Sequence, residues 1–555
     1  MFEKNLSGID NEALKRRLSR ISLEESRRGI SYCVTPSNDY VLLKDDLPSD
    51  DLNNPREAIR NNFKQNIKHE MRSNDIIITF GIGLGYMLDE AFNKYPSKIF
   101  IYEPDLELLH FVLHNVDISE HLASGRVYIT NDLDEMINKL SSTFITKDKV
   151  EIVYLNNYAV IKNKELLLLT QKVFDTCKSK MMDINTISKF SKKWMVNTLH
   201  NVARSNNHSL GYLLSELENK FVGQTALIVA SGPSLNDNIE KIKANRDKFV
   251  VFAVNKVVKY LLEKEIYPDF IVCLDAKNMK KTLEGLDLSK SNCIIDVRTD
   301  TSVFLLGFKK IFLNFSETDF FMKKLQHYNP ALRFYESGGS ASTLALVSAV
   351  KLGFSKIVLA GLDLAFKDNV IYSSGETMQR ISPDEIMVDS EKKNLVQVRS
   401  INGGLVYTRE DYQNFIHHFA TLIKELGYSE IYNISSFGAI IPGVKSCAFE
   451  ELKLFTPALL SSVDIVQPYK FEVKDFMQEE FCQINNIISI LSKGHYSLAL
   501  TNAVVKSSLI YQYMQREVLE ILQKNFTQEM GEEFVANTKS SIKKIVELLQ
   551  KCKLI

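Results

Sequence analysis

Apolar runs alternate with helical patterns in the middle of the chain. Residues 226–276 read ALIVASGPSLNDNIEKIKANRDKFVVFAVNKVVKYLLEKEIYPDFIVCLDA. The runs at 226–230, 249–254 and 270–274 predict buried strands, and the stretches between them predict amphipathic helices. This alternation favours a doubly wound parallel sheet. Each run ends in small or polar residues, and such sheets bind ligands at the carboxyl ends of their strands. We therefore expect a binding crevice here.

The same alternation extends to both sides of this segment. Residues 30–46 predict a hairpin around a turn signal. Further strands are predicted at 75–80, 98–102, 127–129, 150–155, 292–297, 310–313, 356–360 and 430–433. The chain is long enough for several domains. We expect an α/β protein with a hairpin and Rossmann-like domain at 1–160, a helical connector at 161–221, a central domain at 222–455 and a helical bundle at 465–555.

Composition narrows the possible classes of function. The 555 residues include 68 basic and 68 acidic side chains, so the formal net charge is zero. Without a long basic block, no nucleic-acid partner is expected. The charged N-terminal stretch lacks the apolar core of a signal peptide, and no apolar run is long enough to span a membrane, which favours a cytoplasmic location. The seven cysteines show no CxxC spacing, so no metal site is expected.

The first candidate for ligand binding is the turn that ends the strand at 226–230: Ser231, Gly232, Pro233 and Ser234. Glycine lets a ligand approach the backbone closely, and the helix that follows directs unpaired N–H groups at the crevice. This turn is therefore expected to bind a phosphate. The alternative is a tight turn in which Ser234 only caps the helix.

Polar residues also end the next two strands. Asn255 and Asp275 occupy these positions, where they would reach the base or the ribose hydroxyls of a nucleotide. Lys256 and Lys277 stand beside them and are candidates for neutralising phosphate charge. The alternative is that all four are turn residues or solvated side chains.

A second turn of small residues leads into another helical pattern: Ser337, Gly338, Gly339 and Ser340. Its backbone N–H groups would bind an anion from the other side of the crevice. Asp363 ends the strand that follows. Helix capping together with an Asx turn is the alternative.

A third glycine-rich turn lies in the first α/β segment. Gly81, Gly83 and Gly85 follow one strand, and Glu103 ends the next. This spacing resembles the fingerprint of methyltransferases that use S-adenosylmethionine, in which the acidic residue binds ribose hydroxyls. The rest of such a site is not found, so a structural Rossmann-like unit is the preferred interpretation.

The order of these segments resembles the flagellin glycosyltransferases called motility accessory factors, over nearly the whole chain. These share their central domain with pterin diphosphokinase-like proteins. SGPSL at 231–235, Asn255, SGGS at 337–340 and AGLDL at 360–364 are also similar to family 42 sialyltransferases. The resemblance implies a GT-A-like, sialyltransferase-like central domain. Its donor would be a sugar linked to cytidine monophosphate (CMP), with no metal or other cofactor required.

The resemblance also assigns roles to single residues. Gly232, Pro233 and Ser234 would lie along the nucleotide phosphate and ribose. Asn255 would contact CMP, and Ser337 and Gly338 would face the cytidine or its phosphate. The sialyltransferases place a catalytic histidine before a late helix, but residues 406–411 contain none. The proton acceptor therefore stays open among four candidates: Asp275, Glu336, Asp363 and Tyr407.

The resemblance implies a cytoplasmic enzyme that transfers a nonulosonic acid, of the pseudaminic or legionaminic type, from CMP to serine or threonine of flagellin. The N- and C-terminal domains would help to recognise this acceptor. Two alternatives stay open. One is an ATP-dependent hydroxymethylpterin diphosphokinase in which Asp275 and Asp363 hold magnesium. The other is a non-catalytic flagellin-binding chaperone. The sequence does not predict the oligomeric state.

Overall fold

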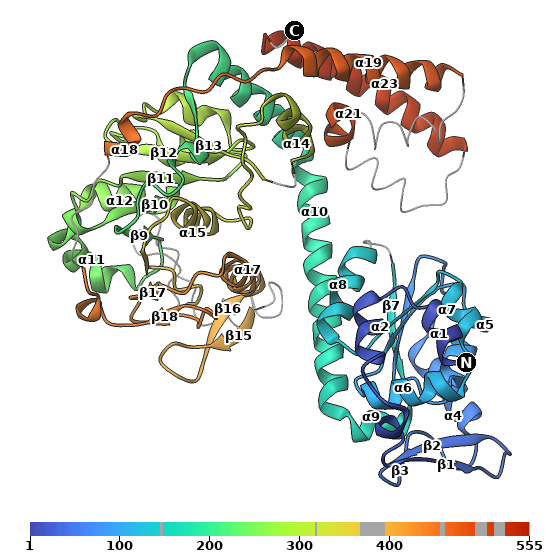
Figure 1. The fold of residues 1–555 in the computed structure, drawn as a ribbon. Helices are drawn as coiled ribbons and strands as arrows, with labels where there is room; N and C mark the ends of the chain where they lie inside the picture. Colours follow the sequence, from blue (N-terminus) through green and yellow to red (C-terminus); the bar gives the residue numbers. More distant parts are fainter. Residues whose placement is uncertain are drawn as a thin grey trace. The chain divides into compact units, whose positions relative to one another are not determined.

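The computed structural model describes residues 1–144, 148–316, 319–366, 395–454, 461–493, 508–514 and 528–553. The chain forms two compact units, Met1–Thr186 and Ile187–Ile555. Each unit has its own buried apolar core. The units are described separately below (Figure 1).

The first unit contains a parallel sheet of four strands in the order β6-β5-β4-β7. Its strands are β4 (Ile76–Phe80), β5 (Lys98–Tyr102), β6 (Val127–Thr130) and β7 (Val150–Tyr154). All five residues of β4 are buried, which is typical of a central parallel strand covered on both faces. A separate antiparallel sheet consists of β1 (Ile30–Val34), β2 (Tyr40–Lys44) and β3 (Leu47–Pro48).

Short helices make up the rest of the first unit. They are α1 (Phe2–Ser7), α2 (Glu12–Leu18), α3 (Leu23–Ser26), α4 (Pro55–Asn66), α5 (Tyr86–Lys94), α6 (Leu106–Asn115), α7 (Ser119–Ala123), α8 (Leu133–Thr143) and α9 (Asn156–Ile161). The long helix α10 (Asn163–His208) begins in this unit and ends in the second one. Leu169 and Val173 of α10 are buried in the first core, and Leu199 and Val202 are buried in the second.

The second unit is built on a nine-stranded sheet in the order β18-β17-β14-β9-β10-β11-β12-β13-β8. Every adjacent pair in this sheet is parallel. Its strands are β8 (Gly211–Leu213), β9 (Thr225–Val229), β10 (Val250–Val254), β11 (Phe270–Cys273), β12 (Asn292–Asp296), β13 (Ile311–Asn314), β14 (Lys356–Ala360), β17 (Ile431–Asn433) and β18 (Lys445–Ser446). A two-stranded antiparallel hairpin is formed by β15 (Leu395–Arg399) and β16 (Leu405–Arg409).

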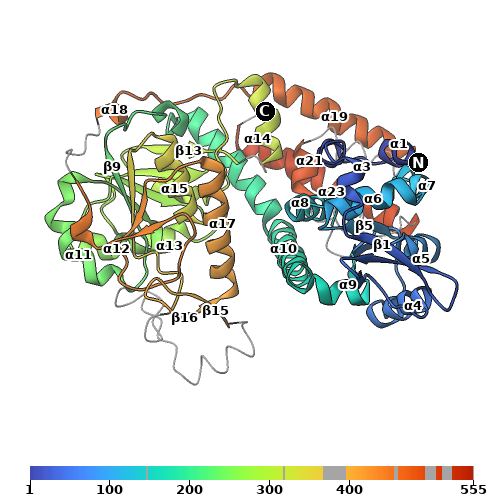
Figure 2. The ribbon, with the colours of Figure 1, turned by 60° about the horizontal axis from the view of Figure 1, so that its bottom comes forward.

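The helices of the second unit include α11 (Leu235–Ala244), α12 (Val258–Glu263), α13 (Met279–Leu283), α14 (Phe320–Leu325), α15 (Ala341–Lys351), α17 (Glu410–Leu426) and α18 (Ser461–Asp464). Helix α15 packs across β14, β9, β10 and β11, and α17 lies beside α15 in both ribbon views (Figures 1 and 2). The C-terminal helices α19 (Lys474–Ser492), α21 (Ser508–Tyr513) and α23 (Gln528–Lys551) pack on one another, and α21 also contacts α14.

The predicted fold class is confirmed, because both units contain parallel sheets with helices between the strands. Every strand expected from an apolar run is present within two residues of its predicted bounds. The sequence analysis did not predict β8, β18 or the β15–β16 hairpin. Strand β8 falls inside the expected helical connector, where it pairs with β13 at the edge of the large sheet.

Candidate functional site

A crevice of about 230 Å³ lies at the carboxyl edge of the nine-stranded sheet. The strand order reverses at β9, because the chain continues from β9 to β10 on one side and later places β14 on the other. Ligands of doubly wound sheets bind at such a reversal. The lining comes from residues 230–232, 254–256, 274–275, 339–342 and 361–365 and from Tyr412, Phe415 and Phe419.

The turns after β9 and β14 are packed directly on each other. The Gly232 N–H donates to the Gly361 carbonyl oxygen at 2.7 Å. A Cβ atom on Gly232 would lie 2.5 Å from that oxygen and 2.7 Å from a carboxylate oxygen of Asp363. Only glycine fits such an approach without displacing backbone, so this position is glycine for a packing reason.

The Asp363 carboxylate lies at the N-terminus of α11, where it binds Ser234. The side chain is buried, and it accepts hydrogen bonds from the Ser234 N–H at 2.8 Å and from the Ser234 hydroxyl. The next N–H groups, of Leu235 and Asn236, donate to carbonyls of the turn itself. The positive end of α11 is therefore already compensated by an anion that belongs to the protein.

The first turn of α15 presents donors to the crevice instead. Ser340 caps the helix by accepting from the Thr343 N–H at 3.1 Å, and the Thr343 hydroxyl accepts from the Ser340 N–H. The N–H groups of Ala341 and Ser342 belong to the helix turn that has no intrahelical partners, and both residues line the crevice. This end of the crevice suits a phosphate or another anion.

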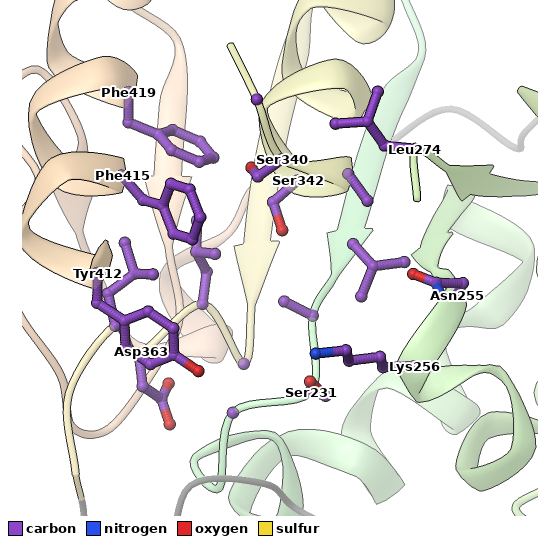
Figure 3. A pocket seen from close by; sticks show the side chains of 18 of the residues that line it. Ser231, Asn255, Lys256, Leu274, Ser340, Ser342, Asp363, Tyr412, Phe415 and Phe419 are labelled. Atoms are coloured by element: carbon purple, nitrogen blue, oxygen red, sulfur yellow. The ribbon is translucent and has the colours of Figure 1, made fainter. Parts of the chain in front are cut away.

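Three further polar side chains line the crevice beyond β10 and β11. Asn255 is buried, and its Nδ2 atom lies 3.4 Å from Oδ2 of Asp275. Lys256 and Asp275 are exposed at the crevice surface. Figure 3 shows Ser231, Asn255 and Lys256 on the side of the crevice opposite α17. A cation, an amide and a carboxylate thus line one crevice.

The last part of α10 holds the loop that carries Asp275. Asn197 Nδ2 donates to the Ala276 carbonyl at 3.0 Å, and Asn201 Nδ2 donates to the Val297 carbonyl at 2.8 Å. The N–H of Asp300 donates to the Asp275 carbonyl at 3.0 Å. The bonds from Asn197 and Asp300 fix the backbone at Asp275 and at the residue that follows it, although the Asp275 side chain is exposed.

Several predicted site residues lie outside the crevice lining. Pro233, Ser234, Ser337 and Gly338 form the turns behind the lining residues. Glu336 is exposed and accepts from the Ser316 hydroxyl at 3.2 Å. Tyr407 is 49% exposed on β16, and Lys277 lies over the ring of Phe190 at 5.5 Å.

The other predicted site residues line the crevice together: Ser231, Gly232, Asn255, Lys256, Asp275, Gly339, Ser340 and Asp363.

Sequence reasoning missed the aromatic side of the crevice. Tyr412, Phe415 and Phe419 of α17 line it, and their spacing of three and four residues places them on one helix face. This spacing was visible in the sequence, but it is the same pattern that predicts a face packed against a core. His417 and His418 lie within α17 and do not line the crevice.

In the first unit, the side chains of Glu103 and Tyr158 pack against the glycine turn at 81–85. Glu103 is fully buried and accepts from the N–H groups of Ile82 and Asp105, each at 3.0 Å, and from the Tyr158 hydroxyl. Burial raises the pKa of the Glu103 carboxyl to about 7. A Cβ on Gly81 would lie 2.8 Å from the Tyr158 ring. The Glu103 carboxylate therefore holds the glycine turn in place through hydrogen bonds within the protein. This favours a structural Rossmann-like unit over a site for S-adenosylmethionine.

Two properties of the described ranges bear on function. No group of three or more His, Cys, Asp or Glu side chains within these ranges is arranged to hold a metal ion. Of the helices in the same ranges, none combines the length and the apolar character that crossing a bilayer requires.

The fold is a doubly wound α/β domain with a crevice at its strand-order reversal, joined by α10 to a second parallel α/β unit. Two protein-family models match parts of the chain. Residues 22–182 match the N-terminal domain of Maf glycosyltransferases. Residues 196–369 match the family described as 6-hydroxymethylpterin diphosphokinase MptE-like. The predicted resemblance to the Maf glycosyltransferases is thus confirmed for residues 22–182, and the resemblance of the central domain to the pterin diphosphokinase-like proteins is confirmed for residues 196–369.

The solved structure of a Maf glycosyltransferase from Magnetospirillum magneticum AMB-1 has the same fold. It superposes with a TM-score of 0.67 and 17% sequence identity over 100% of this chain and 99% of that one. An uncharacterized protein of Treponema pallidum (strain Nichols) is 31% identical over 86 residues, which are 16% of this chain and 39% of that protein.

Proposed function

We propose that this protein is a glycosyltransferase that transfers a nonulosonic acid, of the pseudaminic or legionaminic type, from its CMP-linked form to serine or threonine of flagellin. The observation that carries the proposal is the crevice, in which the first turn of α15 faces Asn255, Lys256 and Asp275. The match to the N-terminal domain of Maf glycosyltransferases supports the general class. The CMP-linked donor and the flagellin acceptor rest on the resemblance stated from the sequence.

The crevice offers the groups that this transfer needs. The acceptor hydroxyl oxygen would form a bond to the anomeric carbon while the bond from that carbon to the phosphate oxygen breaks. The leaving CMP gains negative charge, which N–H groups of the α15 first turn and the Lys256 ammonium are placed to stabilise. Donors that strengthen their interaction as this charge develops lower the barrier rather than merely binding the substrate.

Asp275 is the proton acceptor in this proposal. Of the four candidates, Glu336 and Tyr407 do not line the crevice. Asp363 lines it, but its carboxylate is bound by Ser234. Asp275 lines the crevice with an exposed carboxylate. It would take the proton of the acceptor hydroxyl as the new bond forms.

The test is transfer in vitro, read by the intact mass of flagellin after incubation with the protein and CMP-linked pseudaminic or legionaminic acid. We expect a mass increase of one or more sugar residues with the native protein. Asn255→Ala should reduce it, and Lys280→Ala, an exposed change outside the crevice lining, should leave it unchanged. Flagellin that stays unmodified with every such donor, yet binds the protein tightly, would instead favour the chaperone alternative.

The match of residues 196–369 favours a pterin diphosphokinase as the second candidate. That reaction needs a nucleoside triphosphate with magnesium, for which Asp275 and Asp363 are the candidate ligands. Ser234 already binds the Asp363 carboxylate, which argues against this role. A thermal-shift panel separates the two, since a ligand that binds the native state raises its apparent stability. CMP without metal should stabilise a transferase, and ATP with magnesium should stabilise the kinase.

A further inference from the structure

One side of the crevice is aromatic and has no part in the chemistry proposed above. Tyr412, Phe415 and Phe419 follow one another along α17 and face Ser231 and Lys256 across the crevice (Figure 3). Phe419 is 1% exposed and forms part of the core. Tyr412 and Phe415 are half-buried, and their ring centroids lie 6.2 Å apart at an interplanar angle of 32°. Two tilted aromatic rings therefore lie beside the polar groups of the crevice.

The packing of α17 fixes the position of these rings. Ile416, Leu422 and Ile423 are buried on the same helix, and α17 packs against α15. Leu422 reaches the turn before α15, because a Cβ on Gly338 would lie 2.7 Å from its Cδ1 atom. The aromatic residues and the α15 donors are thus parts of one packed pair of helices, which keeps their separation constant.

The crevice therefore joins two different kinds of surface. Its polar part offers N–H groups and a cation, which suit a phosphate. Its aromatic part offers the rings of Tyr412 and Phe415; the Arg409 guanidinium already lies 4.6 Å from the centroid of the Tyr412 ring, so Phe415 is the main ring for stacking. A ligand that carries an anionic group and a flat heterocyclic ring satisfies both surfaces, since any nucleobase stacks on an aromatic side chain.

We propose that Tyr412 and Phe415 form a stacking subsite for the nucleobase of the bound nucleotide, while the first turn of α15 holds its phosphate. This inference rests on the proposed function, in that the donor carries a nucleotide. It adds which element recognises the base. Base recognition then comes from α17, a helix outside the motifs at 231–235 and 337–340 that carried the sequence resemblance.

Binding of CMP and of ribose 5-phosphate to the full chain tests the subsite by calorimetry. The two ligands share the phosphate and ribose, and only CMP carries a base. Phe415→Leu should weaken CMP about tenfold, which is about 1.4 kcal/mol, and should leave ribose 5-phosphate unchanged. Tyr412→Leu provides a second variant if Phe415→Leu is poorly folded. Equal affinity of wild type and both variants for CMP, or equal losses for both ligands, would overturn the subsite.

An optical measurement gives an independent readout. The chain has one tryptophan, Trp194, so Phe415→Trp adds a single reporter whose emission a stacked base should quench. CMP should quench it and ribose 5-phosphate should not, whereas wild type should show neither change. CMP that binds without quenching would overturn the stacking while leaving the proposed function in place. A wild-type protein that binds no nucleotide would remove the proposed function itself.

Discussion

The Asp363 carboxylate, in the turn that follows β14, accepts hydrogen bonds from both the backbone N–H and the hydroxyl of Ser234, the N-cap residue of α11. The two strands that precede these residues, β14 and β9, are neighbours in the sheet. The pair therefore joins the two turns at the strand-order reversal. Asp363 is thus a positioning residue for the crevice, although the sequence analysis nominated it as a proton acceptor.

Removal of this carboxylate should destabilise the second unit. Asp363→Ala leaves the buried Ser234 N–H unpaired, and a hydrogen bond to a charged group contributes about 1.5–3 kcal/mol. We expect the free energy of unfolding to fall by about 3 kcal/mol, measured by urea denaturation. Ser234→Ala should cost less because the backbone bond stays. Since the two residues are in contact, the double variant should be less destabilised than the sum of the single changes.

Gly232→Ala should disrupt the crevice without any change of charge. The added methyl would lie 2.5 Å from the Gly361 carbonyl oxygen, so the two turns must move apart. We expect loss of CMP binding and a lower melting temperature. Gly223→Ala is the matched control, because Gly223 has open space around a Cβ and a φ of +82°. It should cost about 1 kcal/mol of backbone strain and leave CMP binding intact.

The stability of the first unit should depend on pH through Glu103. Burial raises the pKa of this carboxyl from 4.5 to about 7. The folded state therefore binds the proton more tightly than the unfolded state, so stability is highest below pH 4.5 and falls as pH rises towards 7. The loss is about 3 kcal/mol at 1.36 kcal/mol per pH unit. Hydrogen exchange of the β4 amides at pH 5 and pH 7.5 measures it, after correction for intrinsic exchange rates.

Glu103→Gln provides the control for this pH dependence. Glutamine does not titrate, so the difference in β4 protection between the two pH values should largely disappear. Because glutamine resembles the protonated carboxyl that wild type carries at pH 5, the stabilities of the variant and wild type should be closer at pH 5 than at pH 7.5. A pH dependence that persists in full would show that another group is responsible.

Asp275→Asn should reduce turnover while nucleotide affinity stays near the wild-type value. A positioned general base contributes about 10²–10⁴ in rate, and the substitution keeps the size of the side chain. The measurement is single-turnover transfer to flagellin, with CMP affinity measured in parallel by calorimetry. Turnover within twofold of wild type would exclude Asp275 as the proton acceptor.

The strands were predictable because their signal is local. In β9, β10 and β11 nearly every residue is buried, so each reads as an apolar run bounded by turn residues. By contrast, β8 and β18 have only three and two residues, and they exist because a long-range partner strand is available. No periodicity develops over such lengths.

Which side chains line the crevice was harder to predict than where in the fold the crevice lies. The sequence indicated that the turns at 231–234 and 337–340 meet at one edge, and residues from both line the crevice. It did not indicate which side chains turn inward, since that depends on partners far along the chain. Asp363 turns to Ser234, and Lys277 lies over Phe190. Neither partner is recognisable from spacing.

Helix α10 holds the loop that carries Asp275, so a fragment that retains the crevice must include the last part of this helix. An expression boundary placed just before β9, where the apolar runs begin, would delete Asn197 and Asn201 and release the carbonyls of residues 276 and 297. A fragment intended to keep the ligand site must therefore start within the helix, upstream of these two asparagines.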